Sequence, residues 1–243
     1  MTAIATWLSS PYGCGPSIDQ NFRTDFRYMT STAEYCDWGQ FNCEVTLPHW
    51  QKPIVVSILS IDSELADAER IRYITLRALG EIREVTPIQI VHESELEPNF
   101  MVFVMNDQML ARLSQNDVSS VDFSEGSLHR QAYNNQSCSA RSWVTPLSEI
   151  SSNEYQVALA GAIFVHHSLE GTDLESCIYE EVAGVVGLSN DPEGQPSLFT
   201  EGNYEIVDGQ FRYSQRLLLM FQAIYQIASG EYVDIDDFCD AQN

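Results

Sequence analysis

The stretch CIYEEVAGVVGLSND, residues 177–191, decides the fold. Just before it, Thr172 and Glu175 match a capping box, in which the two side chains satisfy free backbone N–H groups at a helix start. The pattern therefore predicts a helix over residues 173–186. Gly187 is expected to end this helix, because glycine readily adopts the backbone conformation of a helix C-terminus.

A projection at about 100° per residue sorts this helix into two faces. One face is apolar, carries Ile178, Val182 and Val186, and is expected to lie on a sheet. The other face contains the following residues: Cys177, Glu180, Glu181, Gly184 and Leu188. It is either solvated or part of a covered cleft. A bridged Cys177 would favour the cleft, as would Gly184, because glycine within a helix costs about 1 kcal/mol relative to alanine and indicates close approach by another segment.

Adjacent carboxylates in a covered cleft can perform general acid–base chemistry or bind a hard cation through oxygen ligands. Either role needs partners, and His166 and His167 at the end of the preceding strand are the nearest in sequence. One of them must point to each side of the sheet, and a structural role is the common one for a histidine at a strand end. Asn190 and Asp191 are read as turn formers, with the outer end of a site as the alternative.

The flanking sequence predicts an α+β fold of the α/β-sandwich kind, with a twisted mixed sheet. A long amphipathic helix is expected over residues 64–85. Strands are expected at residues 53–59, 88–91, 100–105 and 157–167. Residues 107–153 are expected to form a helix and then a long loop that carries Cys138, and a hairpin and a final helix over residues 211–228 follow.

Three regions differ in composition. Residues 1–47 are rich in Gly, Pro, Ser, Thr and aromatic residues and contain three cysteines, which predicts an irregular arm fastened to the main domain. Residues 48–230 form the α/β domain, and residues 231–243 form an acidic tail. A chain of 243 residues is long enough to bury a sizeable core.

The net charge of −23 excludes two partner classes. Nucleic acids and anionic membranes attract clustered basic residues, but the chain has a single lysine, Lys52. The acidity indicates solubility or life in salt, or else attraction of cations or a basic partner. No run of about 18 apolar residues occurs, so we expect no transmembrane segment.

Cysteine usage indicates an oxidising compartment. The even, scattered set has neither a C-x-x-C pair nor zinc-finger spacing, which suits disulfides better than a structural zinc site. Its members are Cys14, Cys36, Cys43, Cys138, Cys177 and Cys239. We expect a secreted, periplasmic or cell-envelope protein, and the absence of a signal peptide from the first residues is read as a leader already removed.

Several blocks resemble the bacterial domain-of-unknown-function family 2927 over roughly residues 48–228. They are Trp50-x-x-Pro53, the strand at 100–105, Cys138, the Cys-x-x-Glu-Glu…Gly-Leu-x-Asn-Asp block at 177–191, Ser197-Leu198-Phe199 and a Leu-rich helix near Tyr225. The resemblance implies a Cys138–Cys177 disulfide, because it places a cysteine at both points. A second disulfide between Cys36 and Cys43 would then close a short local loop. By elimination, Cys14 and Cys239 would form the third.

The order of elements is also similar to that of zincin metalloproteases, whose helix reads H-E-x-x-H-x-x-G-x-x-H. Glu181 and Gly187 fall on the Glu and Gly of that motif. Its three histidine positions are filled by Glu180, Gly184 and Asn190. Glycine has no side chain to ligate with, so the usual zinc tripod cannot form. We expect no cofactor and no classical metal site, although the carboxylates leave room for a weakly held cation.

Three functional hypotheses follow. The first is an exported zincin-like domain without zinc-ligand histidines that acts as a non-catalytic binding or assembly protein for a protein partner. The second is a peptidase-like hydrolase in which Glu181 is the general base and Glu180, with His166 or His167, holds a metal. The third is a subunit of an extracellular filament or envelope complex, in which the N-terminal arm makes the contacts with the other subunits. The oligomeric state is left open.

Overall fold

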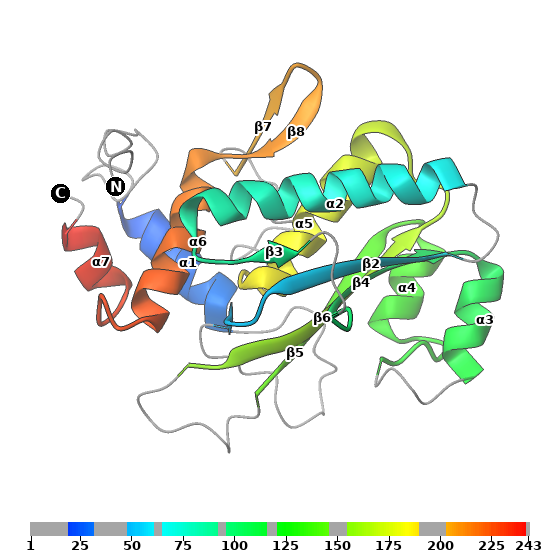
Figure 1. Ribbon diagram of the computed structural model, residues 1–243, viewed down its shortest axis with the longest axis horizontal. Coiled ribbons are helices and arrows are strands. Elements are labelled where there is room, and N and C mark those ends of the chain that lie inside the picture. The colour runs from blue at the N-terminus through cyan, green and yellow to red at the C-terminus, as the bar shows by residue number, and fades with distance from the viewer. Residues whose placement is uncertain are drawn as a thin grey trace.

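A computed structural model describes most of the chain. The described residues are 19–31, 48–60, 65–91, 96–115, 121–145, 155–189 and 203–241. Within them, an α+β fold is observed, as predicted: helices cover both faces of one six-stranded mixed sheet, and a separate two-stranded hairpin stands apart from it (Figure 1).

The main sheet runs in the order β1-β6-β4-β2-β3, and β5 pairs with β6. Its pairings are parallel, except that β5 runs antiparallel to β6. The strands are β1 (His49–Trp50), β2 (Ile54–Ser60), β3 (Ile90–Val91), β4 (Phe100–Met105), β5 (Cys138–Val144) and β6 (Val157–His166). Because the central strands β4 and β6 are covered on both faces, they read as continuous apolar runs.

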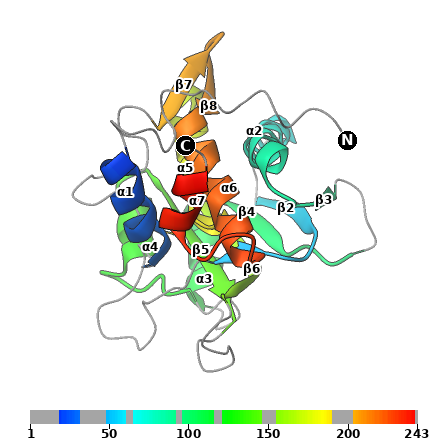
Figure 2. The same ribbon diagram turned by 90° about the vertical axis from the view of Figure 1, so that its left-hand side faces the viewer.

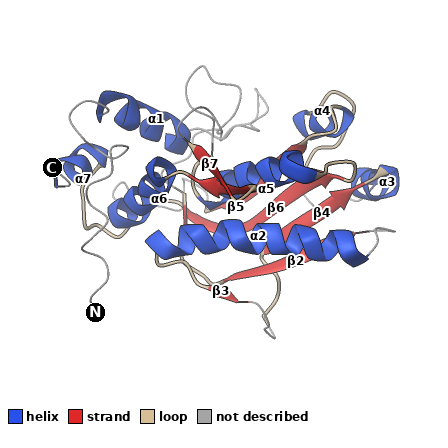
Figure 3. Ribbon diagram, turned by 90° about the horizontal axis from the view of Figure 1, so that it is seen from above, coloured by secondary structure: helices blue, strands red, loops and turns tan. Residues whose placement is uncertain are grey.

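Side chains on alternate strand positions feed two hydrophobic cores. Helices α2 (Leu65–Val85), α5 (Gly171–Val186) and α6 (Gln215–Ala228) pack over one face, on Val104, Ile163 and Val165 among others. Helices α3 (Asp107–Gln115) and α4 (Leu128–Asn134) lie at the other face (Figure 1), near the carboxyl ends of β4 and β6 (Figure 3). There a smaller core contains Met105, Met109, Leu110, Phe123, Ala162 and Phe164.

The start of α5 differs from the prediction. The helix begins at Gly171, and its N-cap residue Glu170 makes no side-chain capping bond. The expected capping box fails because the Glu175 carboxylate accepts hydrogen bonds from Arg77 and from the backbone of Phe211 instead. The end of α5 is as predicted: Gly187 is the C-cap residue, with φ at 153°, a region that favours glycine.

The two chain ends contain helices that the sequence did not predict. Helix α1 (Asp19–Ser31) lies in the region expected to be irregular, and α7 (Ile235–Ala241) lies in the expected acidic tail. The two helices pack together (Figure 2), and their contact includes ion pairs from Arg23 and Arg27 to Asp236. In the tail, Asp236 and Asp240 therefore pair with arginines of α1, and Phe238 is buried.

Two further boundaries are corrections. Cys138 is the first residue of strand β5 rather than part of a loop. The hairpin strands β7 (Tyr204–Val207) and β8 (Gln210–Tyr213) extend into the sequence assigned to the final helix. Helix α6 starts only after Ser214, whose hydroxyl caps it by accepting a hydrogen bond from the Leu217 N–H.

Among the described residues, no helix is long and apolar enough to cross a membrane.

Candidate functional site

Glu81 on α2 is the centre of a buried polar network against the motif helix α5. Its carboxylate accepts hydrogen bonds from the Tyr179 hydroxyl at 2.8 Å, the Arg212 guanidinium at 2.8 Å and the Tyr213 N–H at 3.0 Å. Burial, followed by the nearby Glu81 charge, raises the pKa of Tyr179 well above its ordinary value. The phenol therefore keeps the proton that it donates to Glu81.

A second carboxylate, that of Glu175, extends the same network. It accepts from an Arg77 guanidinium nitrogen and from the Phe211 N–H, each at 2.8 Å. Arg77 also donates from Nε to the Tyr179 hydroxyl oxygen at 2.8 Å. Its guanidinium lies 5.6 Å from the ring centre of Tyr73 and 5.3 Å from that of Tyr179, within cation–π range. Helices α2 and α5 and the hairpin are thus joined by charge-assisted hydrogen bonds.

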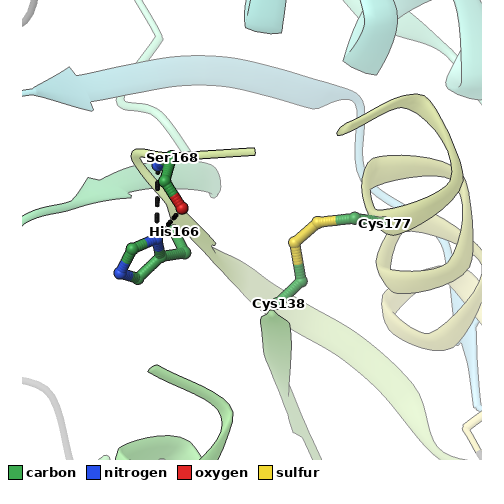
Figure 4. The surroundings of a disulfide bond; sticks show 4 residues. All are labelled: Cys138, His166, Ser168 and Cys177. Atoms are coloured by element: carbon green, nitrogen blue, oxygen red, sulfur yellow. Dashed lines mark hydrogen bonds between the residues drawn. A yellow bond between two sulfur atoms is a disulfide. The ribbon is translucent and has the colours of Figure 1, made fainter. Parts of the chain in front are cut away.

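The Cys138–Cys177 disulfide, which the family resemblance implied, is confirmed. It joins the first residue of β5 to the middle of α5, and the two Cα atoms lie 5.8 Å apart, within the usual range (Figure 4). The predicted pairs Cys36–Cys43 and Cys14–Cys239 fall wholly or partly outside the described residues, although Cys239 is itself disulfide-bonded.

The paired carboxylates lie in different surroundings. Glu181 is 6% exposed, whereas Glu180 is half-buried, and both take part in further interactions. Among the described residues, nothing lies within 4 Å of a Cβ atom placed at Gly184, so the expected close approach is not found there. The close approach occurs at Gly187, where a Cβ atom would lie 2.9 Å from the carbonyl oxygen of Pro48.

His166 lies on the opposite side of the sheet from α5, and His167 is an exposed residue of the turn that follows β6. His166 follows Phe164 in the β6 alternation and so belongs to the face covered by α3 and α4. Its ring centre lies 4.8 Å from that of Tyr133 and 4.7 Å from that of His167. Its Nδ1 lies 2.7 Å from the Ser168 hydroxyl (Figure 4). Burial, then the His167 charge, lowers the pKa of His166.

The structure therefore does not combine the sequence-predicted residues into one site. The rings of His166 and His167 contact each other, and the alternation of β6 directs His166 away from α5. Asn190 and Asp191 lie outside the described residues. Among the residues that are described, no group of three or more His, Cys, Asp or Glu side chains is arranged to hold a metal ion.

Sequence reasoning missed a buried histidine, His129 of α4. Its Nδ1 lies 2.9 Å from the Ser139 hydroxyl, and its ring lies 5.6 Å from Phe123 and 5.5 Å from Phe164. Burial, then the Arg141 charge, lowers the pKa of His129 to about 4. No local pattern predicts this pair, because the aromatic shell is assembled from separate segments.

These features define a class of protein: an α+β domain whose motif helix is fixed by a buried ionic network and by a disulfide. The chain belongs to the family described as "Protein of unknown function (DUF2927)", whose sequence model matches residues 19–211. The match begins at the first residue of α1, so residues 19–47 belong to the matched region although the resemblance was placed over roughly residues 48–228, and the match ends before α6. No curated protein matches the chain.

Proposed function

We propose that this protein is an exported, zincin-like domain that acts as a non-catalytic binding or assembly protein of the cell envelope or exterior. Its shell would keep the zincin order of elements, and its motif helix would serve as a rigid support. The partner would be another protein.

One observation carries the proposal: His166 and the motif helix lie on opposite sides of the sheet, and His167 is in ring contact with His166. A metal held jointly by Glu180 and His166 would have to bridge the packed strands. Other polar residues of the helix, Glu175 and Tyr179, are already engaged with α2 and the hairpin. This arrangement favours a structural use of the helix over the peptidase-like alternative.

Export is supported by the cross-link within the domain. Disulfides persist in oxidising compartments and are rare in the cytosol of mesophiles. The Cys138–Cys177 bond joins two core elements, α5 and β5, and both of its cysteines are buried. Its loss would loosen the motif helix, so a reducing environment would work against the fold.

The test combines metal analysis with a matched pair of variants. Purified protein is assayed for bound metal and for hydrolysis of a mixed peptide substrate, alongside Glu181→Gln and the exposed control Glu231→Gln. We expect no stoichiometric metal and no turnover, with Glu181→Gln less stable by about 1–3 kcal/mol because a buried acceptor is altered. A turnover that Glu181→Gln abolishes and Glu231→Gln retains would establish the hydrolase instead.

A further inference from the structure

The β7–β8 hairpin projects from the body of the domain beyond α2 and α5 (Figures 1 and 2). Its β8 strand contacts α2, α5 and α6, and Phe211 and Tyr213 of this strand are buried. Every residue of β7 is exposed, including Ile206 at 56% and Val207 at 47%. The hairpin thus has one attached strand and one strand that faces solvent.

The backbone hydrogen bonds of the two edges differ accordingly. In an antiparallel pair, alternate residues direct their N–H and C=O groups away from the partner strand. Since the Ser214 N–H donates to the Asn203 carbonyl, the outward groups on β8 are those of Phe211 and Tyr213. Both of these N–H groups donate to buried carboxylates, of Glu175 and Glu81 respectively. The edge of β8 is therefore closed by α2 and α5.

On β7 the corresponding outward groups belong to Tyr204 and Ile206. Ile206 pairs with Phe211 in the hairpin register, and neither its N–H nor its C=O group is hydrogen-bonded to any described residue. An exposed edge of this kind, with apolar side chains, is a ready template for another strand. The buried carboxylates hold it in place, so little ordering is needed on binding.

The charges beside this edge are acidic. Glu205 lies opposite Arg212 in the register, but Arg212 is engaged by Glu81, and no ion pair joins Glu205 to a described residue. Asp208 adds a second exposed carboxylate at the turn. With a net charge of −23, the chain repels a second copy of itself and attracts a basic segment.

We propose that the outer edge of β7 is the docking site for an extended, basic segment of a partner protein, which joins the hairpin as a third strand. The segment would place Lys or Arg beside Glu205 and apolar residues beside Ile206, because side chains alternate along an added strand. This proposal rests on the proposed binding function and supplies its site and the chemistry of its partner.

The probe is a synthetic peptide of three Lys-Val repeats with blocked ends, compared with the matching Glu-Val peptide by titration of the full chain. Three variants are measured. Ile206→Pro removes the outward N–H without removing a hairpin hydrogen bond, and Ile206→Thr keeps that N–H. Val233→Lys changes an exposed apolar residue far from the hairpin in sequence, in the bend before α7. Hydrogen exchange measures how strongly the bound peptide protects the Ile206 amide.

We expect the Lys-Val peptide to bind, to slow exchange of the Ile206 amide about tenfold or more, and to bind Ile206→Pro about tenfold more weakly. Ile206→Thr and Val233→Lys should stay within about threefold of the unchanged protein. Equal binding of both peptides, an Ile206 amide that is not protected, or equal loss in Ile206→Pro and Ile206→Thr would overturn the proposal. So would a dimer of the free protein that Ile206→Pro dissociates. If the peptide-hydrolysis assay instead showed turnover that depends on Glu181, the proposed non-catalytic function would be wrong. The peptide-binding result would still decide whether β7 is a docking site.

Discussion

The two faces of the sheet use polar side chains in opposite ways. On the face of α2 and α5, the buried polar groups are charged and paired, with Glu81 and Glu175 accepting from arginines and backbone N–H groups. On the face of α3 and α4, the buried polar groups are histidines among aromatic rings, and burial lowers the pKa of both His129 and His166. The first face holds paired charges, whereas burial on the second favours the neutral form of its imidazoles.

The difference has a chemical consequence. A metal site made of Glu180 and a histidine needs a carboxylate and an imidazole that converge on one metal and substrate. Here the residue types are present and adjacent in sequence, but β6 separates them, since Val165 faces α5 and His166 faces α4. Proximity along a chain does not bring side chains together when a buried strand lies between them. Each prediction below tests one side of this division.

The largest expected effect is loss of the bond that fastens α5 to β5. Replacing Cys138 and Cys177 together by serine opens a loop with a sequence separation of 39 residues. The chain-entropy relation gives a loss of about 4 kcal/mol in the free energy of unfolding. Urea denaturation of the double variant measures it. Stability within about 1 kcal/mol of the parent would mean that the α5 face is held by its ionic network alone.

The next effect comes from that network. Glu81→Ala leaves the Tyr179 hydroxyl and the Tyr213 N–H buried without their acceptor, and we expect a loss of about 3 kcal/mol. The matched variant Arg212→Ala removes a donor whose side chain is 41% exposed, so about 1 kcal/mol is expected. Equal losses in the two variants, measured by urea denaturation, would contradict the assignment of Glu81 as the centre.

Much of the main sheet was predictable because its signals are local. The apolar runs at β2, β4 and β6 and the helical period of α2 lie within continuous segments, and each element was found close to its predicted bounds. Helix α1 was missed because its burial depends on α7, more than 200 residues away in sequence, as the Arg27–Asp236 hydrogen bond shows with a separation of 209. Propensity alone does not reveal such a partner.

The site was less predictable for the same reason. Glu175 was assigned to a helix cap from a four-residue pattern, but its actual donors, Arg77 and Phe211, are 98 and 36 residues away. His166 and His167 were considered as partners of the α5 carboxylates because they are close in sequence, yet the separation of His166 from α5 depends on which side chains of β6 face which layer. That choice is made by packing in the finished sheet.

A smaller effect is expected on the histidine face, and it depends on pH. The pKa of His129 is about 4 in the folded protein and 6.5 as its ordinary value, so the unfolded chain binds a proton first as pH falls. Stability should drop by about 2 kcal/mol from about pH 7 to about pH 5 through this group and level off below about pH 4. His129→Gln should remove that part of the slope in urea titrations, and an unchanged slope in this variant would contradict the role of His129.

The smallest effect separates two glycines of the motif helix. Gly184 has room for a methyl group and lies within α5, so Gly184→Ala should raise the free energy of unfolding by about 0.5–1 kcal/mol. Gly187→Ala should lower it, because φ is 153° there and the new Cβ atom would lie 2.9 Å from the Pro48 carbonyl oxygen. Thermal unfolding of both variants gives the signs. In the comparison of sequences, Gly184 falls on the second histidine of the zinc-protease motif. A stabilising Gly184→Ala would mean that α5 accepts a side chain at this position that cannot bind metal. A destabilising one would mean that a segment or ligand approaches Gly184, as the covered-cleft hypothesis requires.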